Sequence, residues 1–201
     1  VLANAGDAAR LGNLASLAVR RVRGQTSWVR DPALAGLRVV LGGAAYAAPA
    51  GDAERRALIG ASFSESDVLA PDPRDDLGNL RRLGRMLDCD IEAMRGSVAP
   101  AATGFRFVLR DRLPAIGPLP DEAAARLRAD DLARNGRVPI PLAHGLYGAF
   151  GFGSRGLLWA SLAAEVLPAM VCGEPAPIES DLLDAIAPGR FLVRSARNAG
   201  A

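Results

Sequence analysis

The spacing of apolar residues changes along the chain and divides it into segments. From Ala18 to Phe63, apolar positions alternate with polar residues or glycine, the pattern of half-buried β-strands. We expect a strand pair over 18–29, two strands joined by a tight turn over 37–48, and a further strand over 56–63. These segments predict a mostly antiparallel sheet.

Large apolar residues then recur at spacings of three and four, which is the period of a helix. The pattern runs from Leu77 through Ile91 to Met94 and follows Asp72-Pro73, a typical helix start. We expect this helix to cover one side of the sheet. Residues 104–109 return to a strand pattern, and the glycine and prolines of 114–120 predict a loop of repeated turns.

A second helix is expected from Asp121-Glu122, whose carboxylates suit the positive end of a helix dipole, to Asn135-Gly136. The last third predicts a strand over 145–150, a glycine turn over 151–156 and a helix over 157–171, kinked or shortened by Pro168. A short helix over 181–186 and a tail follow.

The first residues are typical of the end of a buried strand that runs into a glycine turn. Residues 1–6 show this pattern, and no initiator methionine or signal peptide precedes them. Because natural chains rarely start inside a core strand, we expect the sequence to be the C-terminal part of a larger protein.

Composition narrows the class of protein. Half of the 201 residues are hydrophobic and the formal net charge is +2, which excludes a disordered chain. All 24 basic residues are arginines; this indicates either GC-rich coding or phosphate binding, although so small a net charge is a weak signature of nucleic-acid binding. No apolar run of about 18 residues is evident, so we expect no membrane contact.

Residues that could act as nucleophiles or metal ligands are few. Cys89 and Cys172 are far apart and lack metal-binding spacing, which favours the reducing cytoplasm and no metal site. His144 has no serine or cysteine partner at a recognisable spacing. The pairs Asp75-Asp76 and Asp130-Asp131 are more typical of solvated helix faces. We therefore expect a cofactor to supply any chemistry.

Gly151, Gly153 and Gly156 spell GxGxxG between a strand and a helix, the context of a dinucleotide-binding turn. A Rossmann unit would continue into a second parallel strand with an acidic residue about 20 positions on, and this chain does not. The pattern therefore indicates either a structural turn or a helix N-terminus open to a flat or anionic ligand.

Arg106 lies on an expected strand between Phe105 and Phe107. It could bind a carboxylate through two parallel hydrogen bonds, or it could lie on the solvent face of the strand. Periodicity alone favours the solvent face.

Together, these segments resemble the DAO family of FAD-dependent oxidoreductases, the glycine-oxidase and D-amino-acid-oxidase-like group. Residues 2–6, 22–25, 104–117 and 151–156 carry the resemblance in the family's order. Further likeness is to the oxidoreductase domain of bifunctional proteins of tRNA 5-methylaminomethyl-2-thiouridine biosynthesis. It rests on residues 60–63 with Asn79-Leu80, and on residues 110–114, 153–157, 172–175 and 188–191.

The resemblance implies FAD as cofactor and tRNA as substrate, with oxidative removal of the carboxymethyl group from a modified wobble uridine. A methyltransferase domain in the same full-length chain would then methylate the exposed amine. Arg106 would grip the substrate carboxylate. Cofactor contacts would come from Ala5, Gly6, Gly153, Ser154, Arg155 and Gly156, the last four under the pyrimidine edge of the flavin.

The implied fold is α+β. Residues 1–17 would end a strand of the FAD-binding domain, 18–117 would form the substrate-binding domain, and 118–201 would return to the FAD-binding domain. The N-terminal βαβ unit that binds the ADP half of FAD is not in the sequence. Three residues depart from the family pattern: Phe152 replaces a common histidine, Arg21 replaces a frequent proline, and Pro168 interrupts the last helix.

Two alternatives stay open. The first is an amino-acid or sarcosine-type oxidase of the same flavin family that acts on a free small molecule. The second is a non-catalytic fragment that serves as an interaction or RNA-docking module.

Overall fold

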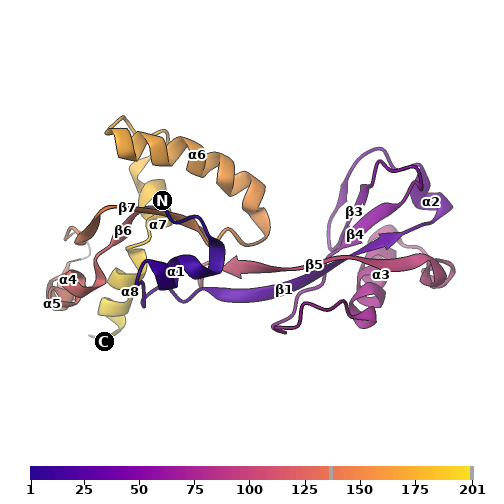
Figure 1. Cartoon of the computed structure of the whole chain (residues 1–201), viewed down its shortest axis with the longest axis horizontal. Coiled ribbons are helices and arrows are strands. Elements are labelled where there is room, and N and C mark those ends of the chain that lie inside the picture. Colours follow the sequence, from indigo (N-terminus) through magenta and orange to yellow (C-terminus); the bar gives the residue numbers. More distant parts are fainter. Residues whose placement is uncertain (136–137, 200–201) are drawn as a thin grey trace. The chain divides into compact units, whose positions relative to one another are not determined.

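The chain forms two compact units in a computed structural model that describes residues 1–135 and 138–199 (Figure 1). One unit is Val22–Phe105, and the other joins Val1–Arg21 to the segment that begins at Arg106. Both contain helices and antiparallel strands, which confirms the predicted α+β class.

The unit of residues 22–105 is built on a five-stranded sheet. In spatial order its strands are β2 (Leu41–Gly42), β3 (Tyr46–Pro49), β4 (Ala57–Gly60), β1 (Arg20–Val29) and β5 (Val98–Val108). Strand β4 pairs antiparallel with two neighbours, so that Ile59 lies opposite Ser27 of β1 and Ala47 of β3. The strands expected over 37–48 and 56–63 are confirmed, although they are shorter.

The strand pair expected over 18–29 is wrong, because Arg20–Val29 forms one continuous strand, β1. The expected break lay at Gly24-Gln25. Gly24 does not adopt a positive φ, and Gln25 is fully buried with hydrogen-bond partners. Gln25 therefore lies in the buried interior of the unit and not in a turn. The short helix α2 (Pro32–Ala35) follows β1.

The predicted helix after Asp72-Pro73 is confirmed as α3 (Pro73–Leu87). Asp72 caps its N-terminus by accepting a hydrogen bond from the backbone N–H of Arg74, and Pro73 occupies the first turn. The helix ends at Leu87, so Ile91 and Met94 lie beyond it, Met94 in a 3₁₀ helix (Glu92–Ser97). Both residues still pack into the core formed around Leu80 and Leu83.

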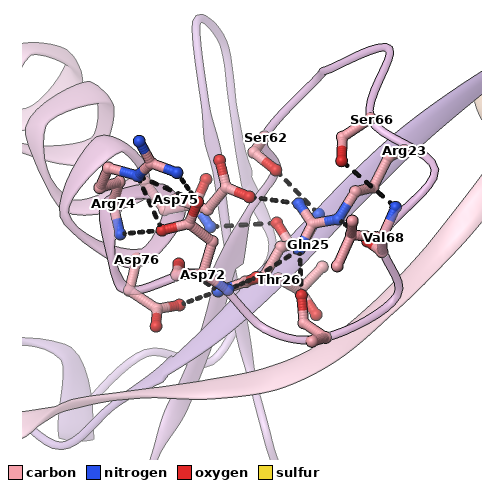
Figure 2. Close-up of polar contacts among 12 residues, drawn as sticks. Arg23, Gln25, Thr26, Ser62, Ser66, Val68, Asp72, Arg74, Asp75 and Asp76 are labelled. Atoms are coloured by element: carbon pink, nitrogen blue, oxygen red, sulfur yellow. Dashed lines mark hydrogen bonds and ion pairs between the residues drawn. The ribbon is translucent and has the colours of Figure 1, made fainter.

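One face of α3 is polar and is joined to β1 by a buried hydrogen-bond network (Figure 2). Asp76 Oδ1 accepts hydrogen bonds from Gln25 Nε2 at 2.7 Å and from Ser27 Oγ at 2.5 Å. Asn79 Nδ2 donates to Ser27 Oγ at 2.8 Å. All four side chains are at most 6% exposed, so the network satisfies groups whose burial without partners would cost stability.

Arg23 extends this network to the loop after β4 (Figure 2). Its guanidinium pairs with Asp75 and donates to the carbonyl oxygens of Val68 at 2.6 Å and Ala70 at 2.8 Å. The adjacent carboxylates of Asp75 and Asp76 therefore have structural partners and do not form a solvated helix face.

The other unit is organised around the antiparallel pair β6 (Ala115–Pro120) and β7 (Leu142–Phe150). Its helices are α1 (Ala8–Leu11), α4 (Glu122–Arg126), α5 (Ala129–Arg134), α6 (Gly156–Cys172), α7 (Ser180–Ile186) and α8 (Arg190–Ala199). A buried cluster that includes Leu109, Leu119 and Phe150 packs against α1 and α8.

Three expectations for this unit are wrong. The loop expected over 114–120 contains strand β6, which tolerates Pro118 and Pro120 because it has a single partner strand and a register shift between these prolines. The helix expected over 121–135 is two short helices, α4 and α5, and its expected end at Gly136 lies outside the described residues. The expected tail contains α8.

Helix α6 is long and apolar. Pro168 does not end it, and the helix continues to Cys172 before Gly173, which has a positive φ. The segment Gly153–Cys172 has a mean hydropathy of 1.3 and meets the length and composition of a membrane span, contrary to the expectation that no such stretch exists. Only 17% of this apolar stretch is buried in the structure, although α6 packs one face against Ile116, Ala149 and Ile186.

An ion-pair cluster joins α8 to the turn between β5 and β6. Arg190, whose side chain is 6% exposed, donates to both oxygens of Asp111, at 2.8 and 3.0 Å. Its other donors bind the carbonyl oxygens of Leu113, Ile186 and Ala187. Arg194 Nη1 also donates to Asp111, at 2.6 Å. Burial alone would raise the pKa of Asp111, but the hydrogen bonds from both arginines outweigh it and lower the pKa to about 2.

The α3 network yields a stability prediction. Replacing Asp76 with alanine lowers the free energy of unfolding by about 2–3 kcal/mol, because buried donors on Gln25 and Ser27 lose their acceptor. Asp76→Asn keeps one side-chain oxygen acceptor and costs less. Urea denaturation of both variants measures the difference, and equal losses would contradict the assigned role of Asp76 Oδ1.

The Asp111 cluster yields a pH prediction. At neutral pH, Asp111→Asn lowers the free energy of unfolding by about 3 kcal/mol, since Arg190 loses its counter-charge. The folded pKa of Asp111 lies below its ordinary value of 3.8, so its contribution is present above that value and is lost as the pH falls through about 2.

Urea denaturation of wild type and Asp111→Asn across this range checks the pH prediction: the two curves should converge in acid. Glu92→Gln, which breaks an exposed ion pair with Arg95, is the matched control and should change stability little. A gap between wild type and Asp111→Asn that stays constant with pH would rule out Asp111 as the titrating group.

Candidate functional site

The three glycines at the corner between β7 and α6 differ in whether the structure requires glycine at their positions. Gly151 has φ +75°, and a Cβ there would lie 2.8 Å from side-chain atoms of Leu109. Gly153 has φ +57° and opens a 3₁₀ helix (Gly153–Arg155) that leads into α6. A Cβ on Gly156 would meet no heavy atom within 4 Å. Packing and backbone conformation explain Gly151 and Gly153, whereas neither explains Gly156.

The surface around Gly156 is open in this chain. Ser154 and Arg155 are exposed, and the side chain of Leu157, in the first turn of α6, is 93% exposed. The corner therefore leaves room for a ligand at the start of a 17-residue helix, where the helix dipole favours negative charge.

The N-terminal segment lies beside β7. Leu2 donates its backbone N–H to the carbonyl of Tyr147 at 2.8 Å and accepts from Ala149 N–H at 2.9 Å, so the expected strand consists of one isolated parallel bridge. Ala5 has φ +54° and begins a 3₁₀ helix (Ala5–Asp7). A Cβ on Gly6 would lie 2.1 Å from the ring of Phe107, so packing alone requires glycine there.

The last residues of β5 contact both the glycine corner and the N-terminal segment. Val108 forms an antiparallel bridge with Phe152, and its Cγ2 lies 3.5 Å from the position of a Cβ on Gly153. Side chains alternate along a strand, so Arg106 lies on the same face of β5 as Val108, and Phe107 lies on the other face. The half-buried Arg106 thus lies on the same face of β5 as Val108, the residue next to Gly153.

Gly6 has its contact with Phe107 on the opposite face of β5. The structure therefore does not gather all the predicted site residues around one side chain. A direct role for Ala5 or Gly6 toward a cofactor stays a prediction.

The other sequence candidates do not form a second site. His144 is exposed on β7, and Cys89 and Cys172 are exposed free thiols. Asp131 lies 3.8 Å from Arg128 in an exposed ion pair. Among residues 1–135 and 138–199, no group of three or more histidine, cysteine, aspartate or glutamate side chains is arranged to hold a metal ion.

Sequence reasoning missed the pairing of Asp111 with Arg190. Both lie in segments that carried the family resemblance, 110–114 and 188–191, but 79 positions separate them. The available signal was that each segment combined a charged residue with proline near an expected turn. That signal marks both segments without showing that they meet.

The residues that the structure describes after α6 do not continue a Rossmann unit. The described residues beyond Cys172 form only the helices α7 and α8, and β6 and β7 are antiparallel. Within the described residues, the glycine corner therefore does not open a βαβ unit.

Solved structures share this fold. Glycine oxidase from Geobacillus kaustophilus matches 91% of this chain and 43% of its own, with a TM-score of 0.65 and 22% identity. Iminodiacetate oxidase from Chelativorans sp. BNC1 matches 92% of this chain and 44% of its own, with a TM-score of 0.61 and 22% identity. At these identities the likeness concerns the fold.

Sequence relatives are closer. The tRNA 5-methylaminomethyl-2-thiouridine biosynthesis bifunctional protein MnmC of Burkholderia vietnamiensis is 45% identical over 98% of this chain, and that of Burkholderia lata is 44% identical over the same share. The chain spans about 30% of the length of both proteins.

The family description "FAD dependent oxidoreductase" (DAO) matches residues 1–170. This match and the similar proteins confirm the resemblance drawn from the sequence. Since it covers most of the 201 residues, the chain belongs to the DAO family of FAD-dependent oxidoreductases.

Proposed function

We propose that the chain is part of an enzyme that oxidatively removes the carboxymethyl group from carboxymethylaminomethyl-(2-thio)uridine at the wobble position of tRNA. The observation that carries this proposal is the placement of Arg106 on the face of β5 beside the glycine corner, in a chain 45% identical to bifunctional proteins of tRNA 5-methylaminomethyl-2-thiouridine biosynthesis. The activity belongs to the complete protein.

The residues at the corner fit the flavin of FAD. Gly156 leaves the start of α6 accessible, and Ser154 and Arg155 are exposed beside it. In the proposed site, the backbone N–H groups of this turn and the helix dipole hold the electron-rich pyrimidine edge of the ring. Gly153 permits the left-handed backbone conformation of this turn.

When bound, FAD supplies the hydride acceptor for oxidation of the secondary amine to an imine, which water then hydrolyses. In the proposed site, Arg106 binds the substrate carboxylate through two parallel hydrogen bonds and so fixes which C–H bond is presented for oxidation. A guanidinium suits this role because it stays charged at every physiological pH.

Arg106 and the glycine corner belong to the same compact unit. We assign both the carboxylate contact and the flavin seat to this unit, which is formed by the two ends of the chain. The sequence predicts a substrate-binding domain over 18–117, which includes Arg106, between the segments 1–17 and 118–201 of the FAD-binding domain. A methyltransferase domain in the complete polypeptide would methylate the amine that this reaction exposes, in the cytoplasm where tRNA is modified.

A second candidate is oxidation of a free small amine. It is favoured by the shared fold with glycine oxidase and iminodiacetate oxidase, since iminodiacetate is itself an N-carboxymethyl amine. Incubating the complete protein with modified tRNA and, separately, with glycine, sarcosine or proline distinguishes the two. Turnover of the free amines alone would overturn the tRNA proposal, and a complete protein without flavin absorbance would favour a non-catalytic module.

For Arg106, we predict that Arg106→Ala in the complete protein lowers kcat/KM by about 2–4 kcal/mol in transition-state terms, because a charge-assisted contact is lost. The loss should vanish on a substrate whose carboxylate is replaced by a neutral amide, which wild type already handles poorly. Steady-state kinetics on both substrates measure this, and equal losses on the two would remove Arg106 from carboxylate binding.

For Gly156, we predict that Gly156→Ala folds normally, since its Cβ meets no protein atom, yet binds FAD at least about tenfold more weakly, a change of 1.4 kcal/mol. The matched control is Gly36→Ala, where a Cβ also meets nothing within 4 Å and φ is negative. Flavin content and FAD titration of the complete protein give the measurement. Normal FAD affinity in Gly156→Ala would place the ring elsewhere.

A further inference from the structure

Arginines gather where α8 meets the β5–β6 turn. Arg110 and Arg112 flank Asp111 on the turn, and Arg190, Arg194 and Arg197 follow one another along α8 at spacings of four and three residues. Residues at these spacings lie on one face of a helix. We call Arg110, Arg112, Arg194 and Arg197 the arginine patch.

Asp111 forms an ion pair with only one member of the arginine patch, Arg194. Its two oxygens accept both hydrogen bonds from Arg190 and one from Arg194, and Oδ1 also accepts from the backbone N–H of Leu113. Arg190 is itself saturated by this carboxylate and three carbonyl oxygens. The single carboxylate is therefore fully used by the pair that holds α8 in place.

The remaining guanidinium groups are accessible. Arg110, Arg112 and Arg197 are exposed, and the side chain of Arg194 is 53% exposed. Within the part of the chain that the structure describes, no carboxylate forms an ion pair with Arg110, Arg112 or Arg197. Positive charge is thus concentrated locally on a chain whose net charge is only +2.

Phosphate diesters match this surface better than an acidic protein does. Guanidinium groups form planar forks that bind phosphate oxygens, and on α8 the patch residues Arg194 and Arg197 lie about 4.5 Å apart along the helix axis at 1.5 Å per residue. A row of like charges suits a polymer with regularly repeated anions, and the proposed substrate is such a polymer.

We propose that the arginine patch binds the phosphate backbone of the tRNA substrate. The inference rests on the proposed function, because that function supplies the RNA. It adds a docking surface outside the glycine corner and gives α8 a second role beside its ion pair with Asp111.

The test measures tRNA affinity of the complete FAD-loaded protein from about 50 to 200 mM salt, the range over which phosphate contacts change binding strongly. The variants are Arg110→Gln/Arg112→Gln and Arg197→Gln, which leave Arg190 and Arg194 on Asp111. The matched control is Arg38→Gln/Arg81→Gln, two exposed arginines in the other unit. Flavin content and the unfolding midpoint report on folding.

We expect the patch variants to bind tRNA several-fold more weakly at low salt, with the slope of log K against log salt reduced by about 0.7–0.9 for each phosphate contact removed. The control should retain wild-type affinity and slope. Unchanged binding in both patch variants, or equal weakening in the control, would overturn the proposal.

The two proposals fail separately. If wild type oxidises modified tRNA and the patch variants bind it as wild type does, only the docking surface is wrong. If the patch variants lose affinity but wild type does not oxidise modified tRNA, the surface stands and the proposed reaction is wrong. A wild-type protein that does not bind tRNA at low salt would overturn the docking proposal.

Discussion

The bidentate contact between Arg190 and Asp111 connects parts of the chain that lie 79 positions apart. It fixes the start of α8 against the β5–β6 turn, while the remaining donors of Arg190 close the carbonyl ends of α7. The same turn follows the last residues of β5, where Arg106 and Val108 lie. Arg190 thus anchors the turn that directly follows Arg106 and Val108, although within the described residues it has no contact with the candidate site itself.

The glycine corner is a second case in which contacts separate roles that a motif combines. Gly151 and Gly153 are required by packing or by a positive φ, and a protein without any ligand would need them equally. Gly156 lacks both reasons. GxGxxG is thus a composite pattern here, because packing or backbone conformation accounts for its first two glycines and not for its last.

Local signals in the sequence predicted local structure well. Asp72-Pro73 marked the start of α3, and the glycine turn marked the passage from β7 to α6, because caps and turns depend on a few adjacent residues. The strand pair expected over 18–29 failed because Gln25 is satisfied by Asp76, 51 positions away. Strand β6 was missed because its prolines are tolerated only in a strand with one partner, which depends on topology. For Arg106, periodicity favoured the solvent face of the strand, and only the family resemblance predicted a role in substrate binding.

The buried side of α6 sets how high its first turn stands above the β6–β7 pair. Ala163, Val166 and Ala169 provide that contact, and two of these three side chains are single methyl groups. Small residues let a helix axis approach a sheet closely. A bulkier residue at Ala163 would act as a wedge and tilt the turn that contains Gly153 and Gly156, so the geometry of the candidate flavin seat is set in part about two helical turns away from it.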